Sequence, residues 1–226
     1  KAIICLLKAI EKECNMALLD LAIYYQDQKN VIKAEEYYLK AIEKGIDGAL
    51  YNIANFYSEL EGEDNFRKAE KYYLMSIDKG HTDALNNLGY LYYFSNNVKL
   101  AEKYFLKAIE NNNKNAIYNL ANLYSEKKYD PNENIDWQKK AEEYYFKAIM
   151  DGNNHALNNL AIMYSSQNNI SDAVKYFSLA WYFLNDDKIK LACEKQICIL
   201  CKTNNPNPII NKHIVNNEME LVDLFN

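Results

Sequence analysis

The sequence contains few of the residues that interrupt helices. Six glycines and three prolines among 226 residues suit packed helices joined by short turns. Twenty tyrosines and a hydrophobic content of 49% are ample for a continuous core. We therefore expect an all-helical chain with little irregular structure.

Catalytic motifs are missing as well. The three histidines, His81, His155 and His213, are scattered, and no nucleophile elbow, phosphate loop or paired-carboxylate pattern occurs. We therefore expect a protein that is not an enzyme and that holds no cofactor.

Basic residues are too few for a nucleic-acid-binding surface. The formal net charge is −5 at pH 7, and Arg67 is the only arginine. Binding of phosphates needs a basic stripe, so we expect no nucleic acid as a partner. There is also no apolar run of about 18 residues or more, so we expect no membrane association.

The five cysteines are unevenly placed and do not form a disulfide framework. No signal peptide is visible, and we expect a reducing compartment, the cytoplasm. The chain begins at Lys1 within a repeat and without an initiator methionine, so the sequence leaves open a targeting segment ahead of it.

The sequence does contain a pattern of small and aromatic residues that recurs five times. An alanine is followed at offset three by Asn or Asp, at four by Leu or Ile, at five by Ala or Gly, and at eight by Tyr. Offsets of four, five and eight share one helical face, so each copy predicts an amphipathic helix. The copies begin at Ala17, Ala49, Ala84, Ala116 and Ala156.

A second helical pattern accompanies the first. An alanine is followed at offset four by a large apolar residue and at offset seven by Ala or Ser. The small residues should lie where a partner helix comes close, and the tyrosines and phenylalanines should fill the wider gaps. Copies begin at Ala2, Ala34, Ala69, Ala101, Ala141 and Ala173.

The two patterns together resemble the tetratricopeptide repeat, with small–aliphatic–small–Tyr in helix A and Ala-x3-Phe/Tyr-x2-Ala in helix B. The junctions over 41–54 and 148–160 are similar to those of Sel-one-like repeats, Ala-Ala-Glu-x-Gly-x-x-x-Ala-x-x-Asn-Leu-Gly. That family carries a longer loop between its two helices. Here only the second and fourth repeats have inserts, around Gly62 and Pro131, so we interpret the chain as a hybrid of the two repeat types.

The resemblance covers residues 1 to about 185 and implies an all-α, right-handed α–α superhelical solenoid of about 5.5 helix-turn-helix repeats. Residues 186–226 would form a C-terminal cap that covers the last open helix face. Within it we expect a helix over 189–201, a break over 204–208 and a short closing helix over 217–225.

Several local signals accompany the pattern. Gly45, Gly80 and Gly152 are placed to end helices in the left-handed conformation, and the Asn111-Asn112 pair replaces them in the third repeat. In the second repeat, residues 61–64 are expected to form a loop. Trp137 is expected to pack on the insert or on the first helix of the fourth repeat and not to bind a ligand.

The candidate site is the face of the first helix of each repeat, which lines the concave groove in tetratricopeptide-like solenoids. Residues two before and two after the repeated aliphatic position should point into it, with the repeated asparagine between them. A row of asparagine amides could bind the backbone of an extended peptide, and tyrosines add flat contact area. The predicted groove residues are Tyr51, Asn52, Asn55, Asn86, Asn87, Tyr90, Tyr118, Asn119, Asn122, Asn158 and Asn159.

The alternative interpretation is that the repeated asparagine is structural and bonds to a neighbouring helix or caps a turn. Lysines are nearly absent from the groove positions, which argues against a clamp for a terminal carboxylate.

A second candidate is a metal site. Cys193, Cys198, Cys201 and His213 carry ligand types that zinc prefers. However, Cys193, Ile197 and Cys201 share one helical face, free cysteines are commonly buried, and the usual glycines are missing. We therefore expect no metal.

The resemblance implies a protein-interaction scaffold or adaptor that binds a peptide or partner helix in the groove. The second hypothesis is a structural spacer or self-associating module, including a homo-oligomer, whose groove is filled by its own residues 204–226. The sequence does not identify the partner.

Overall fold

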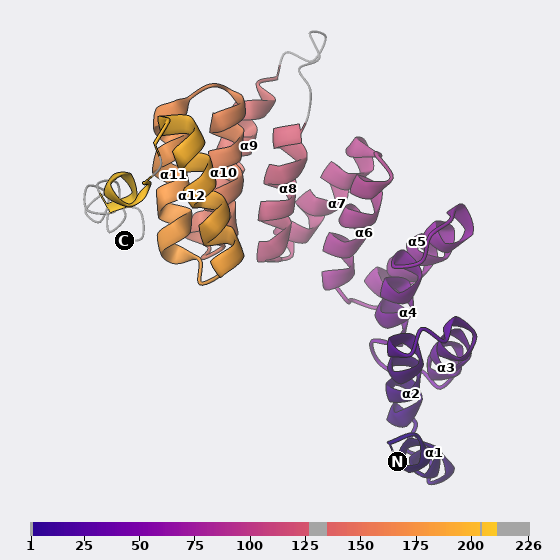
Figure 1. Cartoon of the computed structure of the whole chain (residues 1–226). Coiled ribbons are helices and arrows are strands. Elements are labelled where there is room, and N and C mark those ends of the chain that lie inside the picture. The colour runs from indigo at the N-terminus through magenta and orange to yellow at the C-terminus, as the bar shows by residue number, and fades with distance from the viewer. Residues whose placement is uncertain (1, 127–134, 204, 212–226) are drawn as a thin grey trace. The chain divides into compact units, whose positions relative to one another are not determined.

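The computed structural model describes residues 2–126, 135–203 and 205–211, and within them the fold is all-α, as expected (Figure 1). This part of the chain contains twelve helices, followed by a short helical segment over 207–211. The helices are α1 (Ala2–Glu11), α2 (Met16–Asp27), α3 (Val31–Glu43), α4 (Ala49–Ser58), α5 (Glu63–Asp78), α6 (Asp83–Phe94), α7 (Val98–Glu110), α8 (Lys114–Glu126), α9 (Trp137–Met150), α10 (His155–Ser166), α11 (Ile170–Phe183) and α12 (Asp187–Cys201).

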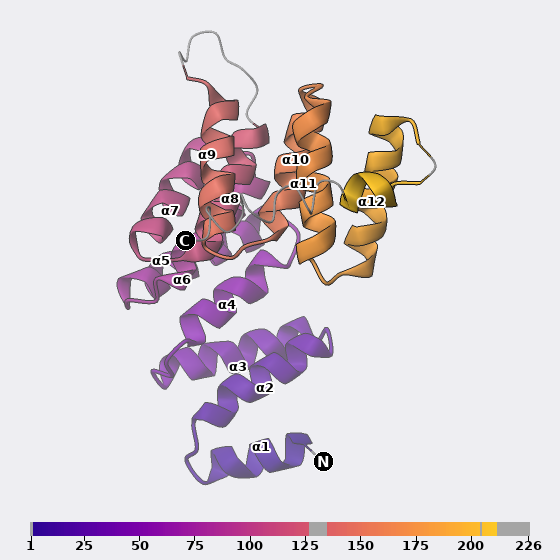
Figure 2. The same ribbon diagram turned by 90° about the vertical axis from the view of Figure 1, so that its left-hand side faces the viewer.

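From α2 to α11 the helices form five pairs, one for each copy of the sequence pattern. The A helices are α2, α4, α6, α8 and α10, and the B helices are α3, α5, α7, α9 and α11. The chain divides into two compact units, 1–113 and 114–226. In unit 1, Figure 1 shows α3 beside α2 and α5 beside α4. In unit 2, Figure 2 shows α10, α11 and α12 next to one another.

Small residues lie where the two helices of a pair approach each other. The pattern alanines of α3, α5 and α7, and the small residues seven positions on, have no exposed surface. Large side chains fill the wider spaces, and burial of each one contributes about 1.5–3 kcal/mol. In unit 1 these large core residues are Tyr38, Tyr73 and Phe105, each 0–2% exposed.

An asparagine caps the B helix in the first, third and fifth repeats. The side-chain oxygen of Asn30, Asn97 and Asn169 accepts a bond from the backbone N–H three residues on, at 3.2–3.3 Å. The residue before each cap is left-handed, with φ of 55–61°. Each cap stabilises its helix by about 1 kcal/mol, which lets the turn between A and B helices stay short.

The expected left-handed helix ends are confirmed. Gly45, Gly80 and Gly152 have φ of 67°, 91° and 88°, and Asn112 has φ of 63°. Glycine adopts this region without a steric cost, and asparagine is the next most tolerant residue.

The loop expected over 61–64 is shorter than the sequence suggests. Helix α5 begins at Glu63, directly after Gly62 with its φ of 107°. Glu63 and Asp64 form the first turn of the helix, where carboxylates are stabilised by the free N–H groups of the helix N-terminus. A stretch that reads as a polar loop is therefore half helical.

In unit 2, Trp137 packs against α8, the A helix of the fourth repeat, as expected. Trp137 is the first residue of α9 and is 5% exposed. Its ring centroid lies 5.4 Å from that of Tyr124 in α8. Asp186 caps α12 by accepting bonds from two backbone N–H groups, and α12 packs on α11.

The expected helix over 189–201 is present and begins two residues earlier than expected, at Asp187. Pro131, His213 and the closing helix expected over 217–225 lie outside the described residues. The division at residue 185 between a solenoid and a cap stays a prediction.

Gly89 in α6 provides a test of the close approach between α6 and α7. A Cβ atom at Gly89 would lie 2.7 Å from Cδ1 of Phe105. The helix propensity of alanine favours Gly89→Ala by about 1 kcal/mol, but overpacking of a buried ring costs about 1–3 kcal/mol. We expect a net loss of about 1 kcal/mol in the free energy of unfolding, measured by urea denaturation.

The control is Phe105→Leu, alone and combined with Gly89→Ala. A smaller side chain at position 105 should remove most of the penalty of the alanine. A more stable Gly89→Ala protein would contradict the close approach.

Candidate partner-binding face

One side of the A helices in unit 1 is formed by residues at offsets two, six and ten from the pattern alanine, which are buried or half-buried at offset two and exposed at offset ten. Residues four apart lie on one side of a helix, so the three offsets form three rows across α2, α4 and α6. We call this surface the A-helix face. Its rows are Leu19, Tyr51 and Asn86; Ile23, Asn55 and Tyr90; and Asp27, Glu59 and Phe94.

Asn87 links α6 to α4 beneath this face. Its Nδ2 donates to the hydroxyl of Tyr51 and to Oδ1 of Asn55, both at 2.9 Å. Asn55 Oδ1 also accepts a bond from the Tyr73 hydroxyl of α5 at 2.7 Å. Three helices of two successive repeats therefore meet in one polar network.

Unit 2 contains the same network. Asn159 of α10 donates to the Tyr118 hydroxyl and to Asn122 Oδ1 of α8, both at 2.8 Å. The Tyr145 hydroxyl of α9 donates to Asn122 Oδ1 at 2.9 Å. The structure thus brings together six of the predicted groove residues in two matched groups, Tyr51, Asn55 and Asn87, and Tyr118, Asn122 and Asn159.

The other predicted asparagines make more local contacts. Asn52 donates to the carbonyl of Gly48, the residue before α4, at 2.9 Å. Asn86 and Asn158 donate to the asparagine that follows each of them, at 3.3 and 3.5 Å. Asn119 is half-buried on α8. The two amide hydrogens of Asn87 and Asn159 are already used within the chain, and a contact of either residue with a partner stays a prediction.

Burial favours the protonated, neutral form of the two core tyrosines in these networks, Tyr73 and Tyr145. Removal from water raises the pKa of Tyr73 and of Tyr145 to about 12. Each hydroxyl keeps its proton and so continues to donate to its asparagine.

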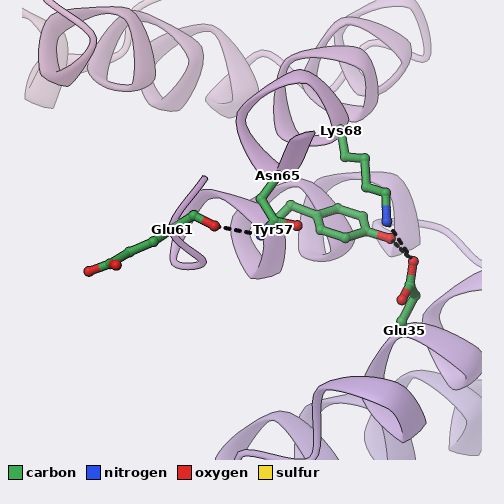
Figure 3. Close-up of polar contacts among 5 residues, drawn as sticks. All are labelled: Glu35, Tyr57, Glu61, Asn65 and Lys68. Atoms are coloured by element: carbon green, nitrogen blue, oxygen red, sulfur yellow. Dashed lines mark hydrogen bonds and ion pairs between the residues drawn. The ribbon is translucent and has the colours of Figure 1, made fainter. Parts of the chain in front are cut away.

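The pattern tyrosines at offset eight connect successive repeats elsewhere. The Tyr57 hydroxyl donates to Oε1 of Glu35 at 2.5 Å, and Lys68 Nζ lies 3.0 Å from the same oxygen (Figure 3). The bond from Tyr57 is the main cause that lowers the pKa of Glu35. Tyr92 donates to Glu70 and Tyr164 to Glu142 in the same way, each across 22 residues.

These tyrosines also stack on a tyrosine of the B helix in their own repeat. The ring centroids of Tyr57 and Tyr72 are 5.8 Å apart, and Lys68 lies over the Tyr57 ring. Figure 3 also shows Asn65 donating to the backbone carbonyl of Glu61 at the start of α5. These contacts link successive repeats, and the residues that make them are not part of the A-helix face.

An aromatic cluster lies on α6, and only one of its members, Tyr90, was predicted from the sequence as a site residue. The ring of Tyr90 lies edge-on to Phe94 with centroids 4.5 Å apart, and Tyr93 lies 6.1 and 5.3 Å from them. Tyr90 is 47% exposed and Phe94 is 68% exposed. Phe94 could have been found from its position four residues after Tyr90, which places both on one side of the helix.

The cysteines of α12 do not form a metal site in the described residues. Cys193 has no exposed surface, and its sulfur lies 3.7 Å from Asn158 Oδ1. Burial raises the pKa of its thiol to about 11, which disfavours the thiolate that a metal needs. No group of three potential metal ligands occurs in the described part of the chain.

A cavity of about 360 Å³ lies at the turn between α3 and α4. Ile42, Leu50 and Met75 form part of its wall, and the His81 imidazole lies 2.9 Å from the Asp47 carboxylate at its edge. None of the predicted groove residues lines it.

None of the helices in the described residues is both long and apolar enough to cross a lipid bilayer.

Replacement of Asn87 tests the network. Asn87→Ala removes two bonds between α6 and α4, and we expect the free energy of unfolding to fall by about 1–2 kcal/mol in chemical denaturation. Asn115→Ala removes an exposed amide in the first turn of α8 and should change stability by less than about 0.5 kcal/mol. Equal effects of the two substitutions would contradict a structural role of Asn87.

Alkaline pH tests the buried tyrosines. In the unfolded chain their hydroxyls ionise near the ordinary pKa of 10.0, whereas in the fold Tyr73 and Tyr145 hold their protons to about 12. The folded state therefore binds more protons in this range, so the contribution is fully present below pH 10 and is lost between about pH 10 and 12. Helicity by circular dichroism should fall together with the rise in tyrosinate absorbance. Complete ionisation of all tyrosines near pH 10 with helices intact would contradict the prediction.

Comparison with known families agrees with the order of the repeats. The tetratricopeptide repeat matches residues 16–45, 82–115 and 155–180, and the Sel1 repeat matches 48–81 and 114–153. The Sel1 matches fall on the second and fourth repeats. Each polar network therefore takes its tyrosines and its accepting asparagine from a Sel1-type repeat, and its donating asparagine from the tetratricopeptide-type repeat that follows.

A comparison with curated proteins gave no match. Among solved structures, the chain is similar to YrrB, a tetratricopeptide repeat protein with an unusual peptide-binding site (21% identity, TM-score 0.54, 84% of this chain and 97% of that one). It is similar to c5321, a protective antigen present in uropathogenic Escherichia coli strains (21% identity, TM-score 0.60, 93% of this chain and 48% of that one). It is also similar to a Sel1 repeat protein from Oxalobacter formigenes (20% identity, TM-score 0.54, 82% of this chain and 74% of that one).

At these identities the structural likeness concerns the fold. Proteins built from these repeats are generally non-enzymatic scaffolds that bind other proteins. The pattern, the helix pairs and the matched repeats together show that the chain belongs to the tetratricopeptide-like helical repeat superfamily, with tetratricopeptide-type and Sel1-type repeats in alternation.

Proposed function

We propose that the chain is a non-enzymatic interaction scaffold that binds a segment of a protein partner on the A-helix face of unit 1. The observation that carries the proposal is the aromatic cluster of the exposed Tyr90 and Phe94 with the half-buried Tyr93. Large aromatic side chains are normally buried, and a rigid exposed pair supplies contact area at a low entropic cost. Aromatic residues of this kind often carry much of the affinity of a protein interface.

The polar network supplies oriented hydrogen-bonding groups beside this cluster. The Tyr51 hydroxyl accepts a bond from Asn87, which leaves its own O–H available to donate outward. A tyrosine hydroxyl held in this way can bind a backbone carbonyl of a partner without paying for reorientation. Within this proposal, Asn87 orients Tyr51, and Tyr51 makes the contact.

The peptide-binding site named for YrrB agrees with such a function on this fold. The competing hypothesis is a spacer or self-associating module whose A-helix face is covered by its own chain or by a second copy.

The double substitution Tyr90→Ala/Phe94→Ala tests the proposal. Partners recovered with the wild-type chain from a lysate of the source cells should be reduced at least tenfold with this variant, measured by quantitative mass spectrometry. The matched control is Tyr182→Ala/Phe183→Ala, which removes an exposed aromatic pair from a B helix, where the two rings lie 5.0 Å apart. The control should retain the partners.

Equal recovery with both variants would place binding elsewhere on the chain and contradict the proposal. If the wild type recovers nothing and sediments as a concentration-dependent oligomer, the self-association hypothesis replaces it.

A further inference from the structure

Positive charge is distributed unequally between the two kinds of helix in unit 1. The A helices α2, α4 and α6 contain no lysine or arginine. Every basic helical residue between α2 and α7 is on a B helix: Lys33, Lys40, Arg67, Lys68, Lys71, Lys99, Lys103 and Lys107.

Several carboxylates on the B helices pair with these cations. Glu36 lies 2.5 Å from Lys40, and Glu63 lies 3.2 Å from Arg67, each pair four residues apart on one helix. The charges on this side of unit 1 therefore largely cancel at short range.

Carboxylates of the A-helix face lack such compensation. Asp27 and Glu59 form no ion pair with any lysine, arginine or histidine in the described residues. Glu59 is instead fixed in place by an uncharged partner, since Gln26 Nε2 donates to its Oε2 at 2.9 Å. Tyr38 in turn donates to Gln26 Oε1 at 2.6 Å. The negative charge of Glu59 is thus positioned without being neutralised.

The position of these carboxylates along their helices adds to the negative potential. Asp27 is the last residue of α2, and Glu59 directly follows α4. Helix C-termini carry a partial negative charge, so a carboxylate there is unfavourable and an added cation is stabilised. Burial first, and then the charges of Glu59 and Asp27, raise the pKa of Tyr38 to about 12.

The same row continues from the carboxylates into the aromatic cluster. Asp27, Glu59 and Phe94 occupy offset ten of α2, α4 and α6, and Tyr90 lies one turn before Phe94. A ligand that follows this row would meet two uncompensated carboxylates and then an exposed aromatic pair.

We propose that the A-helix face of unit 1 binds a protein segment that carries lysine or arginine next to an aromatic or large aliphatic residue. The inference rests on the proposed function and specifies the chemistry of its partner. The cationic groups pair with Asp27 and Glu59, and the apolar side chain packs on Tyr90 and Phe94. An acidic segment is disfavoured because no cation lies on this face to receive it.

Selection from a phage-displayed library of random peptides tests this preference. Peptides enriched on the wild-type chain should contain Lys or Arg well above their frequency in the library, together with an aromatic or large aliphatic residue, and should be depleted in Asp and Glu. A synthetic fluorescent copy of the most enriched peptide then gives affinities by anisotropy. Its binding should weaken as the salt concentration rises, because exposed ion pairs are screened.

Asp27→Asn/Glu59→Gln should weaken the binding of this peptide about three- to tenfold, as expected for the loss of two exposed ion pairs. The matched control is Glu36→Gln/Glu63→Gln, which removes the same net charge from the B helices and should change the affinity less than about twofold. Circular dichroism verifies that both variants remain helical.

Enrichment of acidic or uncharged peptides, or equal weakening by both variants, overturns the charge preference while the proposed function stands. If no peptide binds the wild type better than it binds Tyr90→Ala/Phe94→Ala, the proposed function fails together with this inference.

Discussion

Close approach of helices at buried small residues is the constraint on which the rest of the structure depends. The pattern alanines of the B helices have no exposed surface, and at Gly89 even a methyl group would meet the ring of Phe105. Because the paired helices are so close at the small residues, the large side chains at the neighbouring positions fill the wider spaces between the helices. The A helices can then present the rows at offsets two, six and ten on their other side with a regular spacing.

The second and fourth repeats bring polar groups into this packing in the same way. In the second and fourth repeats a core tyrosine, Tyr73 or Tyr145, replaces the phenylalanine found in the third and fifth, and its hydroxyl needs a partner. Asn55 or Asn122 supplies it and also accepts from the next repeat. In these two repeats the tyrosine hydroxyl is therefore part of a hydrogen-bonded junction that links three helices.

Much of the fold could be predicted from the sequence because helical periodicity and helix-ending glycines are local signals. The same signals predicted offsets two and six of the A-helix face, with Tyr51, Asn55 and Tyr90 among them. The partners of Asn87 could not be predicted, because they come from 32 and 36 residues away and depend on the side-chain conformations of two helices. The loop expected over 61–64 was wrong because Glu63 and Asp64 are polar residues that also favour a helix N-terminus.

The location of Trp137, packed against Tyr124 in unit 2, has a consequence for observing how the chain unfolds. Both tryptophans, Trp137 and Trp181, belong to unit 2, and unit 1 contains none. Indole fluorescence therefore follows the loss of structure in unit 2 alone, whereas far-UV circular dichroism follows the helices of both units. Coincident transitions in the two signals indicate one cooperative body, and separate transitions indicate two bodies that melt independently.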